Sequence, residues 1–295
     1  MPPRIPLTRR LAGRPFRVRD ALAEGWSEDR LSGPDLARPF HGVRTAIDAD
    51  AEHAYAPLLR PGERFSHLSA ARLWGAPLPP RAADVHVTLP GGPRARSRGV
   101  VGHESTAGEI GIRAGLPVSD PATLFCELAG LLDVPALVAV GDHLVLDPRV
   151  LDPHDLRPYL TADALRRAVR SAGGRGIRTA RAAVALVRVG AESPMETALR
   201  LLACNAGLPE PVLQYELRDG HRLIGWFDLA WPERRLFAEV DGDQHRTSRR
   251  QYERDMRRLD AAADAGWRVI RVRAPGILSD PAGTRGRLRR AYGLG

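Results

Sequence analysis

The sequence contains no lysine, so all 44 of its basic residues are arginine. Against 35 acidic residues this gives a formal net charge of +9, which favours a polyanionic partner such as nucleic acid. The same arginine excess, together with abundant alanine, glycine and proline, is also typical of a protein from a GC-rich genome. Basicity by itself therefore shifts the functional interpretation only slightly.

Cysteines and long apolar runs are also scarce. The two cysteines, Cys126 and Cys204, lie far apart in segments with apolar helical spacing. This excludes a cysteine zinc framework and favours buried reduced thiols over a disulfide. No apolar run has the length of a membrane span or follows Arg9 and Arg10 as a signal peptide would. We expect a cytoplasmic protein with no membrane partner.

The chain is long enough for several domains. Its 295 residues, of which 43% are hydrophobic, can bury two or three separate cores. The patterns predict a mixed α/β fold class with four parts. These parts are residues 1–60, 61–155, 156–190 and 191–295.

Residues 1–60 have the pattern of a winged-helix-like module. Residues 18–23 are expected to form a short helix that ends at Gly25, and Ser27 caps a second helix. Residues 39–46 follow as an extended, wing-like segment. In a winged helix-turn-helix the second helix enters the major groove of DNA. A small packing module without any DNA contact has the same pattern, so both interpretations stay open.

Residues 61–155 predict a mixed α/β region without a catalytic constellation. A helix is expected from Phe65 to Trp74, and strands are expected at 84–89 and 100–104. His86 and His103 fall on these strands, and we interpret both as structural histidines.

Residues 156–190 are strongly basic. Seven arginines and no acid lie between Arg166 and Arg188, on two predicted helices separated by Gly173-Gly174. The run is either a phosphate-contacting face or an ordinary solvated helix surface. Together with the later helix at 249–265, it supplies the predicted nucleic-acid-binding residues Arg166, Arg170, Arg178, Arg181, Arg250, Arg254 and Arg258.

From Ser193 onward the pattern predicts the order helix, three-stranded meander, helix, strand. The expected elements are a helix to Asn205, strands at 212–217, 223–230 and 236–241, a helix at 249–265 and a strand at 267–272.

Two acids face each other in the predicted meander. If the hairpin turns at Glu233-Arg234, Asp228 lies directly across from Glu239, with Cβ atoms about 5 Å apart. Directly opposed like charges destabilise a sheet, and there is no lysine to neutralise them. A divalent cation would do so, since converging carboxylates are typical Mg²⁺ ligands.

The segment FDLAWPERRLFAEVDGDQH and the later RRQYERDMRRLDAAADAGWRVIRV resemble the restriction-endonuclease-like, PD-(D/E)xK nuclease fold. The closer resemblance is to bacterial domains related to very-short-patch repair endonucleases, and it covers roughly residues 192–275. It implies an αβββαβ domain in which Asp228, Glu239 and the carbonyl of Val240 hold Mg²⁺ or Mn²⁺. The segment LRRAVRSAGGRGIRTARAA and the front half of the chain are more loosely similar to AbiEi-type antitoxins of type IV toxin–antitoxin systems.

One position departs from the nuclease pattern. Asp241 stands where the resemblance implies a lysine, and a carboxylate cannot stabilise the charge of the transition-state phosphate. Asp241 could instead bind a second metal ion, orient the attacking water or simply form the turn before Gly242. His245 or Gln244 could take over part of the role, and Arg254 or Arg258 could supply the charge.

Glu196 has two interpretations that can hold together. Ser193 and Glu196 have the spacing of a capping box, in which the glutamate accepts the N–H of the cap residue. The resemblance also implies an acid near the metal on this first helix. Asp228, Glu239, Asp241, His245 and Glu196 are thus the predicted catalytic residues, whereas Asp243 is expected in a loop.

Two functions follow from these patterns. The first is an Mg²⁺-dependent endonuclease with a DNA-binding front module, acting in DNA repair, defence or mobile-element biology. The second is a non-catalytic, antitoxin-type DNA-binding regulator whose nuclease fold is degenerate. The absent lysine favours the second function, and the intact acid pair favours the first.

Overall fold

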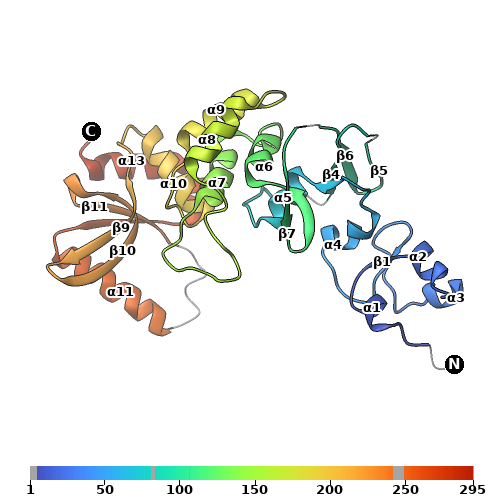
Figure 1. Cartoon of the computed structure of the whole chain (residues 1–295). Helices are drawn as coiled ribbons and strands as arrows, with labels where there is room; N and C mark the ends of the chain where they lie inside the picture. Colours follow the sequence, from blue (N-terminus) through green and yellow to red (C-terminus); the bar gives the residue numbers. More distant parts are fainter. Residues whose placement is uncertain (1–4, 81–83, 93, 106, 242–248, 295) are drawn as a thin grey trace. The chain divides into compact units, whose positions relative to one another are not determined.

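The computed structural model describes residues 5–80, 84–92, 94–105, 107–241 and 249–294 (Figure 1). It is a mixed α/β protein, as predicted, and the chain divides into two compact units, Met1–Leu131 and Leu132–Gly295. Within the described ranges, no helix combines the length and apolarity needed to cross a membrane.

The first unit contains short helices and two sheets. Its helices are α1 (Arg9–Ala12), α2 (Val18–Ala23), α3 (Glu28–Leu31), α4 (Ala51–Tyr55), η1 (Ala56–Leu58), α5 (His67–Leu73) and α6 (Pro121–Leu128). Its strands are β1 (Phe16–Arg17), β2 (Val43–Arg44), β3 (Arg64–Phe65), β4 (Val85–Thr88), β5 (Arg96–Ser97), β6 (Val100–His103), β7 (Ile110–Arg113) and β8 (Leu116–Ser119).

Both helices predicted in the front part form. The hydroxyl of Ser27 accepts the N–H of Arg30, so Ser27 caps α3 as expected. Helix α3 is a single turn, and strands β1 and β2 pair beside it as an antiparallel ribbon. Leu11, Phe16 and Leu31 contribute to the small apolar core that holds these pieces together.

The larger sheet of the first unit has the strand order β5-β6-β4-β3-β8-β7. The helix predicted to begin at Phe65 begins at His67 instead, because Phe65 pairs with Val87 on β4 and Val118 on β8. Phe65 is fully buried at this position, so its apolar side chain belongs to the sheet rather than to a helix face.

The second unit contains one four-stranded sheet and seven helices among its described residues. The helices are α7 (Val134–Val145), α8 (Ala162–Ser171), α9 (Ile177–Leu186), α10 (Pro194–Asn205), α11 (Arg249–Asp264), α12 (Ala274–Leu278) and α13 (Pro281–Tyr292). The strands are β9 (Val212–Asp219), β10 (Arg222–Trp231), β11 (Leu236–Val240) and β12 (Arg268–Val272), and η2 (Pro232–Arg234) joins β10 to β11.

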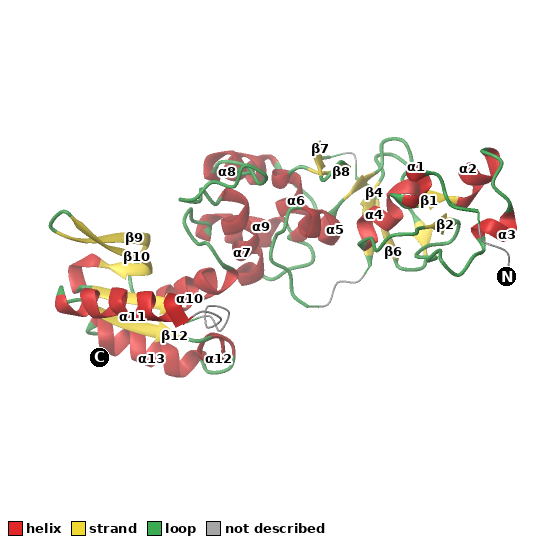
Figure 2. Cartoon of the chain, turned by 90° about the horizontal axis from the view of Figure 1, so that it is seen from below, coloured by secondary structure: helices red, strands yellow, loops and turns green. Residues whose placement is uncertain are grey.

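The sheet of the second unit has the order β12-β11-β10-β9, with only β11 and β12 parallel. Helices α10 and α13 cover one face of the sheet and α11 covers the other (Figure 1). Helix α12 packs on the same face as α10 and α13, and α11 lies in front of the sheet in Figure 2. Leu199, Trp231 and Leu288 are buried on the first face, and Phe227, Phe237 and Ala262 are buried on the second. The predicted order αβββαβ is therefore formed by α10 to β12.

The β10–β11 hairpin has the predicted register. Leu229 pairs with Ala238, Ala230 with Phe237, and Trp231 with Leu236. The chain reverses through η2, after which Arg235 takes a left-handed conformation with φ of 46°.

A buried ion pair fixes α10 against α7. Arg200 and Asp142 are both almost fully buried, and a guanidinium nitrogen lies 2.9 Å from a carboxylate oxygen. Asp142 also accepts the hydroxyl of Thr197 at 2.8 Å and the N–H of Arg188 at 2.7 Å. Glu210 binds the other terminal nitrogen of Arg200 at 2.8 Å, so the buried cation is well compensated.

Replacing Asp142 with alanine is expected to destabilise the protein by about 3–5 kcal/mol, because it leaves the charge of Arg200 buried without its main partner. Urea unfolding monitored by circular dichroism measures this change. Asp163→Ala removes an exposed acid that pairs with Arg166 on α8 and should change stability by less than about 1 kcal/mol. Equal effects of the two substitutions would contradict the anchoring role of Asp142.

Candidate active site

Strands β10 and β11 bring Asp228 and Glu239 to one end of the hairpin. The backbone ladder stops at Leu229 and Ala238, one position before these acids. Asp228 instead uses a carboxylate oxygen to accept the N–H of Val240 at 2.9 Å. Glu239 is only 6% exposed, and Asp228 is half-buried.

Glu196 joins these two acids from the first turn of α10. Its N–H donates to the hydroxyl of Ser193, as in the predicted capping box. Its carboxylate accepts the N–H of Glu192 at 2.9 Å, one residue before the expected Ser193, and the side-chain amide of Gln214 at 3.2 Å. Glu196 is 8% exposed, so the cap holds a buried carboxylate at the sheet.

Asp228 repels both Glu196 and Glu239 in a poorly solvated place. Burial raises the pKa of Glu196 to about 7, and the nearby Asp228 adds to the shift. Burial also raises the pKa of Glu239 to about 7 against the opposing effect of Arg258, and Asp228 raises it further. Burial likewise raises the pKa of Asp228, while the N–H of Val240 and the charge of Arg258 oppose the shift. The site therefore holds negative charge that the surrounding side chains compensate only in part.

Arg258 on α11 is the cation that binds Glu239 directly. One terminal nitrogen donates to Glu239 at 2.7 Å and to the carbonyl of Trp226 at 2.5 Å. Its guanidinium carbon lies 4.7 Å from the centre of the Phe227 ring. Gly225 leaves room for it, because a Cβ there would lie 2.6 Å from the Cδ of Arg258. Of the two arginines expected to supply positive charge, Arg258 contacts Glu239, while Arg254 is exposed.

Stacked aromatic rings pack beneath the guanidinium group of Arg258. Phe227 stacks on Phe237 with ring centres 4.0 Å apart, and Phe237 stacks on Trp267 at 4.1 Å. These rings come from three separate segments of the chain, so the position of Arg258 depends on the packing of the whole face.

Asp241 is engaged by two arginines. Arg271 on β12 binds one carboxylate oxygen at 2.8 Å and Arg273 binds the other at 3.3 Å. Asp241 is therefore less available to hold a second metal ion or to orient water than the sequence suggested. This position, at which the resemblance implies a lysine, lies beside two positive charges.

Several predicted residues lie outside the described part of the chain. These are His245, Gln244 and Asp243, and the side chain of Arg250 is likewise outside it, although its backbone belongs to α11. Their roles stay predictions.

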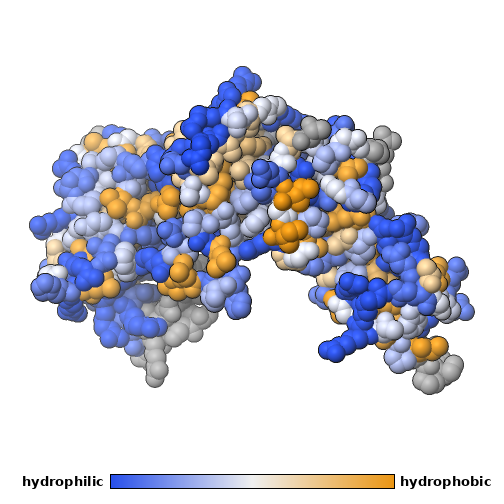
Figure 3. All heavy atoms as spheres, in the orientation of Figure 1, coloured by the Kyte–Doolittle hydropathy of each residue, from blue (hydrophilic) through white to orange (hydrophobic). Residues whose placement is uncertain are grey.

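The basic helices α8 and α9 form a shared surface. Arg166, Arg170 and Arg181 line an open hollow of about 500 Å³, together with Val169 and Val184. Arg178 is exposed on α9. Figure 3 shows hydrophilic side chains gathered over these helices beside apolar ones. The hollow is wide enough for a backbone group of a polyanion, although Arg166 already pairs with Asp163 at 2.7 Å.

Only one trio of His, Cys, Asp or Glu side chains within the described ranges has all its ligand atoms within 4.8 Å of one another. It consists of His67, His86 and His103 in the first unit. The three acids of the second unit are thus less tightly gathered, and a cation there would have to draw them closer. His67 was not singled out from the sequence, because it was expected inside a helix beginning at Phe65.

No family model matches the chain. It is 27% identical over 259 residues to a protein of Mycobacterium tuberculosis strain H37Rv, and equally so to one of strain CDC 1551. Both relatives are named uncharacterized proteins, and the alignment covers 86% of this chain and 92% of each relative.

Replacing Glu196 with glutamine should change how stability depends on pH. The folded-state pKa of about 7 exceeds the ordinary value of 4.5, so the wild-type protein loses stability as pH rises through 7. The glutamine variant lacks this loss and should be more stable than wild type at pH 8 by up to roughly 3 kcal/mol, with little difference at pH 4.5.

Urea unfolding at the two pH values, without divalent cations, measures the effect. Glu253→Gln on the exposed side of α11 is the control for removal of a carboxylate elsewhere in the unit. A Glu196→Gln variant with the same pH dependence as wild type would show that Glu196 is not buried among repelling acids.

Proposed function

We propose that the second unit hydrolyses phosphodiester bonds in nucleic acid, and specifically in DNA, with the help of Mg²⁺ or Mn²⁺. The observation that carries the proposal is the burial of Glu196, Asp228 and Glu239 together, with pKa values of about 7 for the two glutamates. Structural acids are normally solvated or fully paired, so partly compensated buried acids favour a functional site.

The residues present fit a hard divalent cation. Mg²⁺ prefers carboxylate and carbonyl oxygens, and Asp228, Glu239 and the carbonyl of Val240 would hold it. When bound, such an ion polarises the phosphoryl oxygen and lowers the pKa of its water. It would also lower the pKa values of the two glutamates, which burial raises most and the charge of Asp228 raises further.

The side chains divide the remaining tasks. Arg258 lies beside Glu239 and would turn from it toward a phosphate, supplying the positive charge otherwise given by lysine. His245 stays the proposed acceptor of the proton from water, because Asp241 is engaged by Arg271 and Arg273. The arginines of α8, α9 and α11 would contact the nucleic-acid backbone.

A second candidate is a non-catalytic DNA-binding regulator of antitoxin type. The observations that favour it are the ion pairs of Glu239 with Arg258 and of Asp241 with Arg271 and Arg273. In this alternative the arginines permanently replace the metal ion. The front part, with α2, α3 and the β1–β2 ribbon, would recognise DNA under either proposal.

Replacing Asp228 with asparagine should abolish Mg²⁺-dependent cleavage, with a decrease of at least roughly a hundredfold, because one anionic ligand is removed at nearly constant volume. The measurement is cleavage of supercoiled and single-stranded DNA by the full chain, with Mg²⁺, Mn²⁺ or EDTA. Asp219→Asn, at the far end of β9, is the matched control. Cleavage that survives Asp228→Asn would contradict the site, and a wild-type protein that binds but never cleaves DNA would favour the regulator.

The hollow between α8 and α9 predicts salt-dependent binding of a polyanion. Replacing Arg170 and Arg181 with glutamine should lower the slope of log affinity against log salt by about 2, one for each phosphate that the variant no longer neutralises. Fluorescence anisotropy of a labelled duplex at several salt concentrations measures the slope. The matched control is the pair Arg285→Gln and Arg290→Gln, two exposed positions on α13. An equal effect of the two pairs would indicate a response to net charge alone.

A further inference from the structure

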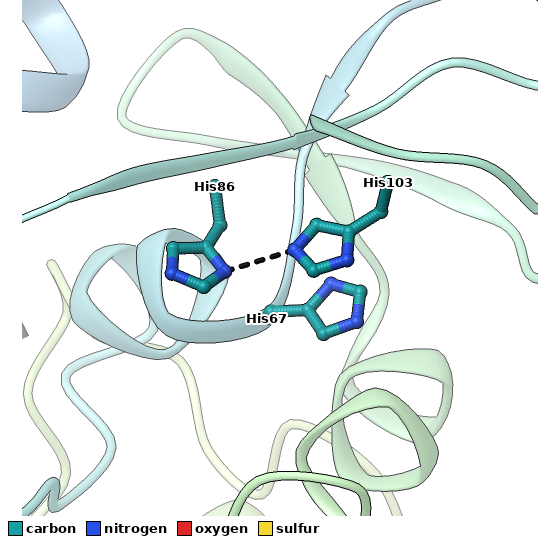
Figure 4. A group of neighbouring side chains, drawn as sticks. All are labelled: His67, His86 and His103. Atoms are coloured by element: carbon teal, nitrogen blue, oxygen red, sulfur yellow. Dashed lines mark hydrogen bonds between the residues drawn. The ribbon is translucent and has the colours of Figure 1, made fainter. Parts of the chain in front are cut away.

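Three histidines meet in the first unit, apart from the acids discussed above. His67 begins α5, directly after β3, while His86 lies on β4 and His103 on β6. These strands are neighbours in the order β6-β4-β3, so segments distant in sequence deliver their imidazoles to one place. Figure 4 shows the three rings turned toward one another.

The spacing of the rings suits a single metal ion. The Nδ1 atom of His86 lies 2.9 Å from the Nε2 atom of His103, and one ligand atom from each histidine lies within 4.8 Å of the other two. In a tetrahedral zinc site with Zn–N bonds of about 2.0 Å, the nitrogens are roughly 3.3 Å apart. The His86–His103 pair would open by a few tenths of an ångström, and His67 would move out of its stack on His103, where the ring centres are 3.6 Å apart.

The surroundings keep the imidazoles in the neutral form that binds metals. Burial lowers the pKa of His67 to about 3 and that of His103 to about 4, and it also lowers the pKa of His86. Two arginines near the cluster are themselves paired, Arg64 with Glu127 at 3.4 Å and Arg72 with Glu52 at 2.6 Å. Much of the nearby positive charge is therefore compensated.

His67 is held in place by a carboxylate and by an unusual backbone. Glu127 accepts its N–H at 3.0 Å, and a carboxylate oxygen of Glu127 lies 3.8 Å from the Nδ1 atom of His67. Carboxylates behind a histidine are the usual outer partners in metal sites. His67 has φ of 48°, a left-handed conformation that costs a non-glycine residue free energy and recurs at functional positions.

We propose that His67, His86 and His103 form a binding site for a divalent transition metal of the zinc type, with the fourth position left to water. Three imidazoles select zinc, cobalt, nickel or copper over Mg²⁺, so this site is chemically distinct from the carboxylates of the second unit. The inference does not depend on the proposed nuclease function.

Cobalt titration of the untagged, full-length protein tests the proposal. We expect one equivalent of Co²⁺ to bind with the visible absorption of tetrahedral or five-coordinate cobalt, without a thiolate charge-transfer band, and to be displaced by Zn²⁺ but not by Mg²⁺. Alanine at His67, His86 or His103 should each weaken binding at least a hundredfold. His41→Ala, at an exposed histidine of the same unit, and Asp228→Asn should leave this visible absorption unchanged.

Circular dichroism identifies any variant that fails to fold. If a strand variant does not fold, the His67→Ala result decides, because His67 begins a helix and is not part of a strand. A wild-type protein that takes up no Co²⁺ or Zn²⁺ at micromolar concentration overturns the proposal. The absorption of tetrahedral or five-coordinate cobalt surviving replacement of all three histidines overturns it as well. If Asp228→Asn loses nuclease activity but still binds cobalt, the histidine site and the proposed nuclease site are independent of each other.

Discussion

The burial of Asp228 and Glu239 at one end of the β10–β11 hairpin creates a charge that the rest of the second unit has to balance. The N–H of Val240 solvates one carboxylate, and Arg258 binds the other. Arg258 can reach that place because Gly225 has no side chain to block it. The balance is incomplete, since the pKa of Glu239 remains near 7 beside its arginine. Under the proposed function, a metal ion would complete this balance, and Arg258 would leave Glu239 to bind a phosphate.

The position of Glu196, the third acid, depends on the contacts between α10 and Asp142 of α7. Thr197, the neighbour of Glu196, donates to Asp142, and Asp142 binds the buried Arg200 one turn further along α10. The helix is therefore held by α7 as well as by the sheet, and its first turn delivers Glu196 to the acids. Stability and site geometry are coupled here, because loosening this ion pair would also release a carboxylate from the cluster.

Local sequence patterns predicted many of the helices and strands of this architecture. Contacts that depend on pairing between distant strands could not be predicted from these patterns. The alternation in β10 and β11 and the turn between them gave the correct register, and Ser27 and Ser193 marked two helix starts correctly. The partners of Asp241 could not be predicted in this way, because Arg271 and Arg273 reach it through the parallel pairing of β11 with β12. The charges of Asp241 and the arginines do not indicate which strand, distant in sequence, will pair with β11.

The histidine cluster was missed for the same reason. His86 and His103 were placed on strands, but the sequence does not state that β4 and β6 are parallel neighbours. His67 was assigned to the interior of a helix, whereas the strand at Phe65 moves the helix start to His67 itself. A two-residue error in the predicted helix boundary therefore hid a residue of the proposed histidine site.

Proton release on metal binding distinguishes a carboxylate metal site from a permanent network of ion pairs in the second unit. Mn²⁺ would be titrated calorimetrically into the protein at pH 7 in two buffers with different heats of ionisation, using a His67→Ala background to remove the histidine cluster. Because the pKa values of Glu196 and Glu239 lie near 7, we expect binding to expel a substantial fraction of a proton per site, and Glu239→Gln to abolish both binding and release. Binding with no proton release, or no binding with or without DNA, would contradict a carboxylate metal site in the second unit.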